Sequence, residues 1–469
     1  MAEDLLPVVG VNLGGGDGEG EDDSSDSDIG ADEQREDADA ASEDEEEEKM
    51  EEDAVPDINY DASLPGAHSY LGNDLEDVRG RTVHEDDTYL NLPLLPMPGV
   101  VLVPGQTLPL QLFQQSIVSM VRRIVEEDKT FGLITARYSS NDFSLVPDKI
   151  GTTAEIFSYK EENDDLSGIT MLRVKATGRQ RFEVMEKRRQ SDGILMGKVR
   201  ILPERNLPPA LEGATLETQR RWCISCREGE PTTPPPGGAG DRQRAREQFF
   251  GTQIKRRKPK KFSEAHYTWW PSWVYKQYDA QDLVRRVKLE LKSWNETLKS
   301  SNMPSDPVEF SYWVAGILPL DDSMKILLIS IDCAVQRLRC ELSIMQKCTV
   351  FICRFCGHPI TNKRDVFSMA LEGPMAAYVN PGGYVHETLT VYKAQGLVLR
   401  GAPSTENSWF PGYAWTIVEC RSCNHHMGWK FTAVKRKTKP DKFWGLVRAS
   451  LQPGFLAMED DGEEWRPTL

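Results

Sequence analysis

Cys353-Arg-Phe-Cys356 and Cys420-Arg-Ser-Cys423 are two Cys-x-x-Cys knuckles that decide how the C-terminal part of this chain folds. A two-residue gap lets one tight turn present two sulfurs to the same ion. Four such thiolates therefore suit a tetrahedral Zn²⁺ with Zn–S distances near ~2.3 Å. Because all four positions are filled by protein, the knuckles predict one structural zinc.

The remaining cysteines leave one competing zinc assignment. Cys223 and Cys226 form a third Cys-x-x-Cys, but it adjoins a Pro/Gly-rich stretch and has no partner knuckle nearby. Cys333 and Cys340 fall in a helical pattern and are expected in the core. The chain has nine cysteines, an odd number, and no secretory signal. This composition argues against a disulfide framework and for metal ligands plus buried thiols.

Length and charge divide the chain of 469 residues into an acidic tail and a nearly neutral body of two or three domains. Residues 1–53 hold 23 Asp and Glu against two basic residues, a local balance of −21 that leaves the remainder near +4. Residues 1–55 are thus expected to be a disordered acidic tail. The sequence contains no apolar stretch approaching the ~20 residues of a membrane span and no signal peptide. We expect a soluble protein of the cytoplasm and nucleus.

Residues 88–212 are predicted to form a β-rich domain, because short apolar runs alternate there with turn residues. One helix is expected near residues 117–125, where apolar residues recur at helical spacing. The expected strands follow from six apolar runs, at residues 100–103, 131–135, 153–157, 169–174, 181–185 and 194–201.

Residues 213–347 are predicted to form a helical bundle interrupted by a Pro/Gly-rich insertion at 228–242. The basic run at 255–261 suits nuclear import, an acidic partner or a solvated loop, and no groove-reading module supports nucleic-acid binding. Apolar residues from Met324 to Met345 alternate spacings of four and three, which predicts one helix of about 25 residues, capped by Asp321 or Asp322. Core packing is the favoured interpretation of four tryptophans here, Trp269, Trp270, Trp273 and Trp294.

Residues 348–456 are predicted to form a zinc-clamped all-β domain, and residues 457–469 a flexible tail. Strands are expected at 365–370, 376–379, 387–392, 397–400, 414–418 and 430–434. Four aromatic residues gather in this region, Trp409, Trp415, Trp429 and Phe431. They either fill the core of a small sheet or form an aromatic cage for a cation or a flat neutral ring.

The opening of the β-rich domain, residues 92–110, resembles the start of the N-terminal domain of Lon proteases, as do residues 151–156 and 178–182. An ATP-driven protease needs a Gly-x-x-x-x-Gly-Lys-Ser/Thr phosphate loop, and the sequence contains none. The resemblance therefore implies a Lon-type binding domain without the protease. The fold class that we expect is α+β multidomain: a β-rich Lon N-terminal-like domain, an α-helical bundle and a zinc-clamped all-β domain.

Residues 373–381, 383–392 and 408–415, taken with the Lon-like domain and the helices, resemble a family of substrate receptors of the cullin-4 RING ubiquitin ligase. The likeness spans roughly residues 56–456. It implies a non-catalytic receptor that binds glutarimide rings of the thalidomide class, or cyclic imides at protein C-termini, and presents substrate proteins for ubiquitination and proteasomal degradation. The helical bundle would bind the β-propeller adaptor of the ligase.

The same resemblance implies a ligand pocket in the zinc domain. Trp409, Trp415 and Trp429 would wall it and Phe431 would close its base. Asn380 and Pro381 would form the adjoining loop, and backbone groups at positions 407 and 409 would bond the imide. Asn407, where the family usually has histidine, and Gly382 depart from the family pattern.

Two other functions stay open. A Lon-like binding or scaffold protein would need no ligase. A methionine sulfoxide reductase of the B type also has a zinc-clamped β domain, but its chemistry needs a free nucleophilic cysteine in that domain. Residues 349–469 contain no cysteine beyond the four predicted ligands, so a non-enzymatic role is favoured.

Overall fold

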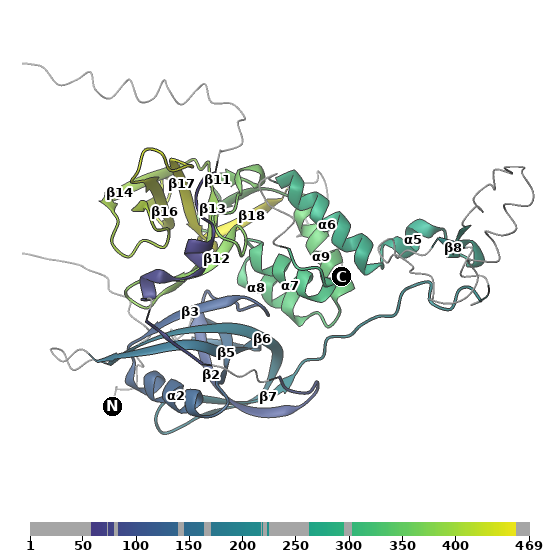
Figure 1. The fold of residues 1–469 in the computed structure, drawn as a ribbon, viewed down its shortest axis with the longest axis horizontal. Helices are drawn as coiled ribbons and strands as arrows, with labels where there is room; N and C mark the ends of the chain where they lie inside the picture. The colour runs from purple at the N-terminus through teal and green to yellow at the C-terminus, as the bar shows by residue number, and fades with distance from the viewer. Residues whose placement is uncertain are drawn as a thin grey trace, which may run out of the picture.

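The computed structural model describes residues 58–72, 74–78, 83–138, 145–163, 170–216, 218, 223–224, 262–294 and 303–455. Within them a β-rich domain, a set of helices and an all-β C-terminal region follow one another, which confirms the predicted fold class (Figure 1). The acidic tail, the 228–242 insertion, the 255–261 basic run, the C-terminal tail and Cys226 lie outside the described residues.

The N-terminal β domain is a seven-stranded sheet in the order β1-β5-β4-β2-β7-β6-β3, with an additional β5–β6 pairing. Its strands are β1 (Glu76–Asp77), β2 (Tyr89–Pro98), β3 (Thr107–Leu112), β4 (Thr130–Tyr138), β5 (Leu145–Asn163), β6 (Thr170–Arg189) and β7 (Leu195–Ile201). The predicted helix is α2 (Gln115–Glu126), whose buried side chains pack into the core of this sheet. Two runs were expected as separate strands, 169–174 and 181–185, but the described residues of both runs belong to the single strand β6, which begins at Thr170.

The prediction of a strand at residues 100–103 is wrong, because this segment pairs with no strand among the described residues. Its side chains alternate between two cores: Val100 and Leu102 face the sheet, whereas Val101 and Val103 face the helices. The Leu102 carbonyl accepts a hydrogen bond from the Thr152 hydroxyl at 2.7 Å. The apolar run therefore packs between the β-rich domain and the helices and does not extend a sheet.

The helical region contains α5 (Ser272–Lys276), α6 (Ala280–Trp294), α7 (Pro307–Ile317), α8 (Asp322–Ser330) and α9 (Ala334–Lys347). Asp321 caps α8 as predicted, since its carboxylate accepts from the Met324 amide at 2.7 Å. Among the described residues no helix is both long and apolar enough to cross a lipid bilayer.

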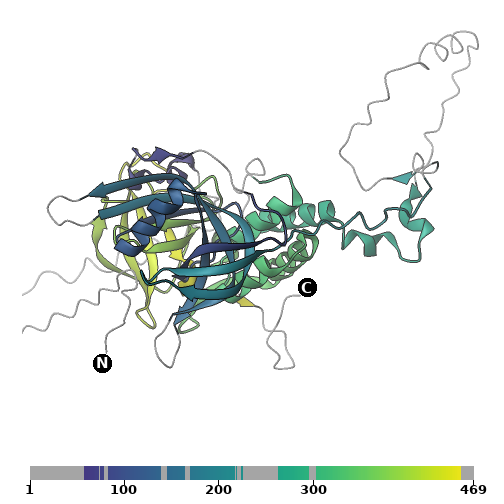
Figure 2. The ribbon, with the colours of Figure 1, turned by 90° about the horizontal axis from the view of Figure 1, so that it is seen from below.

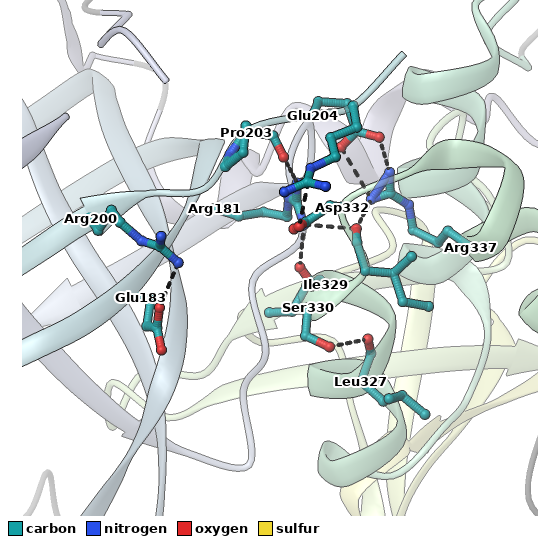
Figure 3. Close-up of polar contacts among 12 residues, drawn as sticks. Arg181, Glu183, Arg200, Pro203, Glu204, Leu327, Ile329, Ser330, Asp332 and Arg337 are labelled. Carbon is teal, nitrogen blue, oxygen red and sulfur yellow. Dashed lines mark hydrogen bonds and ion pairs between the residues drawn. The ribbon is translucent and has the colours of Figure 1, made fainter. Parts of the chain in front are cut away.

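The prediction of a single helix of about 25 residues is wrong, because α8 ends at Ser330 and α9 begins at Ala334. Arg181 of β6 reaches the break and donates to the Ile329 and Ile331 carbonyls at 2.9 and 2.8 Å (Figure 3). Arg337 of α9 donates to the Ile331 carbonyl as well, at 3.2 Å. A guanidinium from another domain thus satisfies carbonyls that a continuous helix would have used.

Three of the four tryptophans expected in the helical core are instead on the surface. Trp294 is buried as expected, but Trp269, Trp270 and Trp273 expose 99%, 63% and 62% of their surface. The last of them belongs to α5, which lies on an arm that projects from the body of the protein (Figures 1 and 2). An arm this narrow has no interior in which a large ring could be buried.

The C-terminal region combines a three-stranded sheet, order β11-β10-β18, with a six-stranded sheet, order β12-β13-β17-β16-β15-β14. The first contains β10 (Cys348–Cys353), β11 (Pro359–Asn362) and β18 (Leu451–Phe455). The second contains β12 (Met375–Val379), β13 (Val385–Val391), β14 (Leu397–Ser404), β15 (Tyr413–Cys420), β16 (His426–Ala433) and β17 (Lys442–Val447). Residues 365–370 were expected as a strand, but Asp365 ends a 3₁₀ turn and the residues after it make only isolated bridges, so that expectation is wrong.

A buried cluster of charges joins the three parts. Arg448 donates to Glu387 of β13, to Asp322 of α8 and to the Gly99 carbonyl of the β-rich domain, each at 2.7 Å. Lys325 of α8 donates to the other Glu387 oxygen at 2.7 Å, and both cations are fully buried. This cluster, Asp322–Lys325–Glu387–Arg448, is called the ionic node below.

The N-terminal segment 58–72, purple in Figure 1, runs along the C-terminal sheet and touches both β domains. Asn59 exchanges side-chain hydrogen bonds with the backbone of Lys437 and Lys439, both at 2.8 Å. Lys175 of β6 donates to the Ala67 carbonyl at 2.7 Å. Further along, the Tyr70 hydroxyl accepts from the Val379 amide at 3.2 Å. The segment therefore links the β-rich domain to β12.

Candidate functional site

The two knuckles form a metal site whose sulfurs are close together. Cys353 ends β10 and Cys420 ends β15, so the four sulfurs come from both C-terminal sheets. Each knuckle closes with an amide donating back to its first cysteine, from Gly357 and Asn424, both at 2.8 Å. These two closing residues have positive φ angles of 73° and 56°, the left-handed conformation that glycine and asparagine tolerate best.

The sulfur spacing fits one zinc ion. The Sγ atoms of Cys353 and Cys423 are 3.7 Å apart, those of Cys356 and Cys420 are 3.6 Å apart, and all four lie within 4.8 Å of one another. A tetrahedron with Zn–S bonds near ~2.3 Å has edges of about 3.8 Å. Four thiolates and no open position mark a structural site, in which zinc would tie the three-stranded sheet to the six-stranded sheet.

Trp415, Trp429 and Phe431 lie on one face of the six-stranded sheet, on the two strands that flank the second knuckle. Trp415 of β15 pairs directly with Phe431 of β16, and Ile417 pairs with Trp429 two positions along. Since side chains alternate across a strand, residues two apart share a face. The four side chains therefore form one apolar floor and wall.

Trp409 closes this surface from the loop before β15. Its ring is perpendicular to that of Trp429, with centroids 4.6 Å apart and an interplanar angle of 73°. It is stacked on Tyr378 at 5.2 Å, and its indole Nε1 donates to the Val379 carbonyl at 3.1 Å. The Trp415 Nε1 donates to the Glu406 carbonyl at 2.8 Å. Both indoles are thus held by the protein itself, which fixes the walls before any ligand arrives.

These rings surround a pocket of about 580 Å³, which we call the aromatic pocket. All seven residues predicted for the ligand site line it: Asn380, Pro381, Asn407, Trp409, Trp415, Trp429 and Phe431. Their role in binding stays a prediction. The sequence left open whether these aromatic residues fill the core or form a cage. Both hold, because Trp409 and Phe431 are only 6% and 1% exposed and belong to the aromatic core as well as to the pocket wall.

The loop that carries Asn407 contains backbone amide and carbonyl groups without a backbone hydrogen-bond partner among the described residues. Asn407 has φ +51°, a conformation that asparagine tolerates and β-branched residues do not. Among the backbone hydrogen bonds of the described residues, none uses the amide or carbonyl of Asn407 or of Trp409. These groups are next to the rings and remain available to a polar ligand.

The opposite lip of the pocket is a turn fixed by its own side chain. The Tyr384 amide donates to the Asn380 side chain at 2.8 Å, and the Gly383 amide donates to the Asn380 carbonyl at 2.9 Å. Gln111 of β3 donates to the Pro381 carbonyl at 3.3 Å. The β-rich domain therefore touches the rim of the aromatic pocket.

Two histidines complete the wall, and both are held neutral. The ring centroids of His386 and His426 are 5.1 and 4.9 Å from that of Trp429. Burial lowers the pKa of His386 to about 4, and the nearby His426 adds to this shift. Burial also lowers the pKa of His426, with His425 contributing in the same direction. The pocket interior thus carries no histidine charge near neutral pH.

Five lining residues were missed by sequence reasoning: Tyr384, His386, Glu406, Ile417 and His426. Ile417 could have been found, because it is two residues after Trp415 on the same strand. His426 begins β16, the strand that carries Trp429, but lies outside the strand expected at residues 430–434. Tyr384, His386 and Glu406 come from loops and the strand β13, whose approach depends on the fold of the whole domain.

Comparison with known proteins agrees with this architecture. Residues 91–347 match the model of the ATP-dependent protease La (LON) substrate-binding domain. Residues 349–462 match the family described as Yippee zinc-binding/DNA-binding /Mis18, centromere assembly.

Full-length relatives cover most of the chain. Protein cereblon of Xenopus tropicalis is 50% identical over 407 residues, which cover 87% of each chain. Protein cereblon of Gallus gallus is 50% identical over 88% of this chain and 89% of its own length. The chain belongs to the cereblon family. The relative from Danio rerio is 47% identical over 87% of this chain and 90% of its own. Together with the four-cysteine cluster, the zinc-binding family match supports one structural zinc.

Proposed function

We propose that this protein is the substrate receptor of a cullin-4 RING ubiquitin ligase and that it binds glutarimide rings or C-terminal cyclic imides in the aromatic pocket. It would present the bearer of such a ring for ubiquitination and proteasomal degradation. The observation that carries this proposal is the pocket itself: three tryptophans and a phenylalanine around about 580 Å³, beside a loop with unused backbone groups.

The geometry favours a flat, neutral ring. Trp409 and Trp429 are in edge-to-face contact and form a corner of the pocket, and their apolar faces suit a ring of a few carbon atoms. A cyclic imide has one N–H donor between two carbonyl acceptors. The free backbone groups at positions 407 and 409 supply both complementary functions. Only backbone atoms are needed there, so the change from histidine to Asn407 is compatible with binding.

A cationic ligand is the competing occupant, because Glu406 lines the pocket and rings bind cations through their faces. Glu406 is exposed at the rim, however, and no acidic side chain is among the buried lining residues. A methylated-lysine peptide therefore belongs in the same experiment as a cyclic-imide peptide.

The region from residue 349 onward has no spare cysteine for the chemistry of a methionine sulfoxide reductase. Residues 349–469 contain four cysteines, and all four are in the zinc cluster. A reductase would need a further thiol to attack the sulfoxide. Turnover of methionine sulfoxide by the full chain would overturn this part of the proposal.

We propose that the helical region docks to the β-propeller adaptor. The exposed Trp273 belongs to α5 on its projecting arm (Figure 1), and the exposed Trp269 and Trp270 come just before this helix in the chain. Large exposed rings are typical of interaction surfaces. We propose that the protein acts in the cytoplasm and nucleus, without nucleic acid or membrane as partner. A protein that fails to co-purify with the adaptor would fit the Lon-like scaffold alternative instead.

Calorimetric titration of the full chain with a peptide ending in a cyclic imide tests the pocket. Binding is expected in the wild type and in Trp273→Ala, a control that removes an exposed tryptophan from the arm. Binding should disappear in Trp415→Ala. Equal binding by Trp415→Ala, or preference for a trimethyl-lysine peptide, would contradict the imide assignment.

A further inference from the structure

A second pocket, of about 560 Å³, lies where the β-rich domain, the helices and the C-terminal sheet meet. We call it the junction pocket. The N-terminal segment contributes His68 to its lining, the β-rich domain Arg179, helix α7 Trp313 and Gly316, and the C-terminal region Tyr378. No residue is shared with the lining of the aromatic pocket.

Helix α7 leaves part of this space open. Gly316 is buried, yet a Cβ atom built on it would meet no atom within 4 Å outside its own helix and chain neighbours. A buried glycine normally marks a close approach of another segment, as at Gly132, where a Cβ would lie 2.6 Å from Leu94. At Gly316 the missing side chain opens directly into the junction pocket.

His68 presents a hydrogen-bond donor to the pocket. The ring is only 3% exposed, and its Nδ1 is 2.9 Å from the Tyr70 hydroxyl. That hydroxyl already accepts from the Val379 amide, so its own proton is best placed on His68 Nδ1. Burial lowers the pKa of His68 to about 4, so the ring is neutral and carries its proton on Nε2. The described residues provide no partner for this Nε2–H.

Two carboxylates give the pocket rim a negative character. Glu309 of α7 and Glu372, just before β12, both line the pocket, and neither forms an ion pair within the described part of the chain. The one guanidinium in the lining, that of Arg179, is bound to Glu155 at 2.6 Å. The Trp313 indole donates to the Glu372 backbone carbonyl at 2.8 Å, which fixes its ring against this segment of the chain.

From this arrangement we infer that the junction pocket binds a small organic amine with a flat apolar body and a hydrogen-bond acceptor. The acceptor meets the His68 Nε2–H, the body fills the space above Gly316 against the aromatic rings, and the ammonium reaches Glu309 and Glu372. The ligand's acceptor, apolar body and ammonium would thus each contact a complementary group of the pocket lining.

The probe for this site is para-(aminomethyl)benzamide, which carries a carbonyl acceptor and an ammonium at opposite ends of one ring. Ligand-detected NMR titration of the full chain should show binding. Para-methylbenzamide, without the charge, should bind about tenfold more weakly, because a charge-assisted contact is lost. Glu309→Gln/Glu372→Gln should remove this preference and leave the neutral amide unaffected.

Gly316→Leu fills the pocket from the helix and should abolish binding, while Gly316→Ala should weaken it only partly. A melting temperature at or above that of the wild type checks that both variants fold. Trp415→Ala, in the aromatic pocket, should bind the probe normally. Absence of binding to the wild type, undiminished binding by Gly316→Leu, or loss of binding in Trp415→Ala would overturn the inference. None of these results bears on the cyclic-imide titration.

Discussion

Replacing Glu387 by glutamine removes the carboxylate that contacts both Lys325 and Arg448 in the ionic node, while keeping nearly the same shape. Arg448 retains Asp322 at 2.7 Å, but Lys325 loses its carboxylate partner. Both cations are fully buried, so solvent cannot replace the lost charge. We expect this substitution to loosen the contact between α8 and β13.

The magnitude follows from the titration of Glu387. Burial alone would raise the pKa of its carboxyl, but the charges of Arg448 and Lys325 outweigh burial and lower the pKa from 4.5 to about 2. Glutamine resembles the protonated carboxyl, so the variant forfeits the stabilisation that this depressed pKa represents, roughly 3 kcal/mol. Breaking buried ion pairs by removing one partner costs a similar ~3–5 kcal/mol.

The pH dependence has a definite sign. Because the folded-state pKa of Glu387 is depressed, its contribution is fully present above the ordinary value of 4.5 and is lost as the pH falls towards about 2. Wild type and variant should therefore differ most near neutral pH and converge in acid. Lys325 does not mask this effect. Burial lowers its pKa to about 8, despite Glu387, so its titration lies well above the acid window.

Native-state hydrogen exchange measures this cost locally, at the amides of α8 and β13, which suits a protein with several domains. Glu419→Gln is the matched control, since its partner Arg400 is exposed at the sheet edge and such pairs contribute less than about 1 kcal/mol. A loss in Glu387→Gln no larger than in Glu419→Gln, or a difference that persists undiminished in acid, would contradict the stabilising role of Glu387 in the ionic node.

Three further outcomes are expected. Chelation of zinc should abolish exchange protection where the two C-terminal sheets meet and leave the N-terminal β domain protected, because zinc binding energy is largely folding energy; retained protection would contradict a structural zinc. Glu204→Gln should lower the stability of the contact between that domain and the helices by about 3 kcal/mol, because Glu204 pairs with Arg181 and Arg337, both buried; urea unfolding measures it. Gly428→Ala should be strongly destabilising and should weaken imide binding, because a Cβ there would lie 2.1 Å from the Gly445 carbonyl and φ is +141°; an unchanged melting temperature would show that the strand can shift freely.

The metal site and the cage strands could be predicted because their signals are local. A Cys-x-x-Cys knuckle brings its two sulfurs together through one turn, whatever the rest of the chain does. Trp429 and Phe431 share a face because they are two residues apart on a strand. The partner strand carrying Trp415 was expected from its own alternation. Local geometry thus accounts for most of the aromatic pocket.

The break between α8 and α9 could not be predicted, because its cause is far away in the sequence. The apolar spacing from Met324 to Met345 continues through residues 331–333 as if the helix were unbroken. Arg181, from β6, takes the carbonyls at the break, and Glu204 neutralises it from the segment after β7 (Figure 3). Periodicity reports which side chains are apolar, but it contains nothing about a cation arriving from another domain.

The exposed tryptophans on the arm could not be predicted either, because burial of a large ring depends on tertiary structure. Composition favours burial of large rings, and Trp294 obeys it, yet Trp269 is almost fully exposed on the arm. The position of His386 in the wall of the aromatic pocket could not be predicted either, since no sequence spacing links it to Trp429, which it contacts. In both cases the surroundings depend on tertiary structure rather than on neighbours in the chain.

The most direct test of the receptor role is ubiquitin transfer in a reconstituted cullin-4 RING assembly containing the β-propeller adaptor. The substrate is a protein ending in a C-terminal cyclic imide, compared with the same protein ending in an ordinary carboxylate. We expect ubiquitination of the imide-bearing protein by the wild type and none by Trp415→Ala. Equal ubiquitination of both substrates, or full activity of Trp415→Ala, would contradict it.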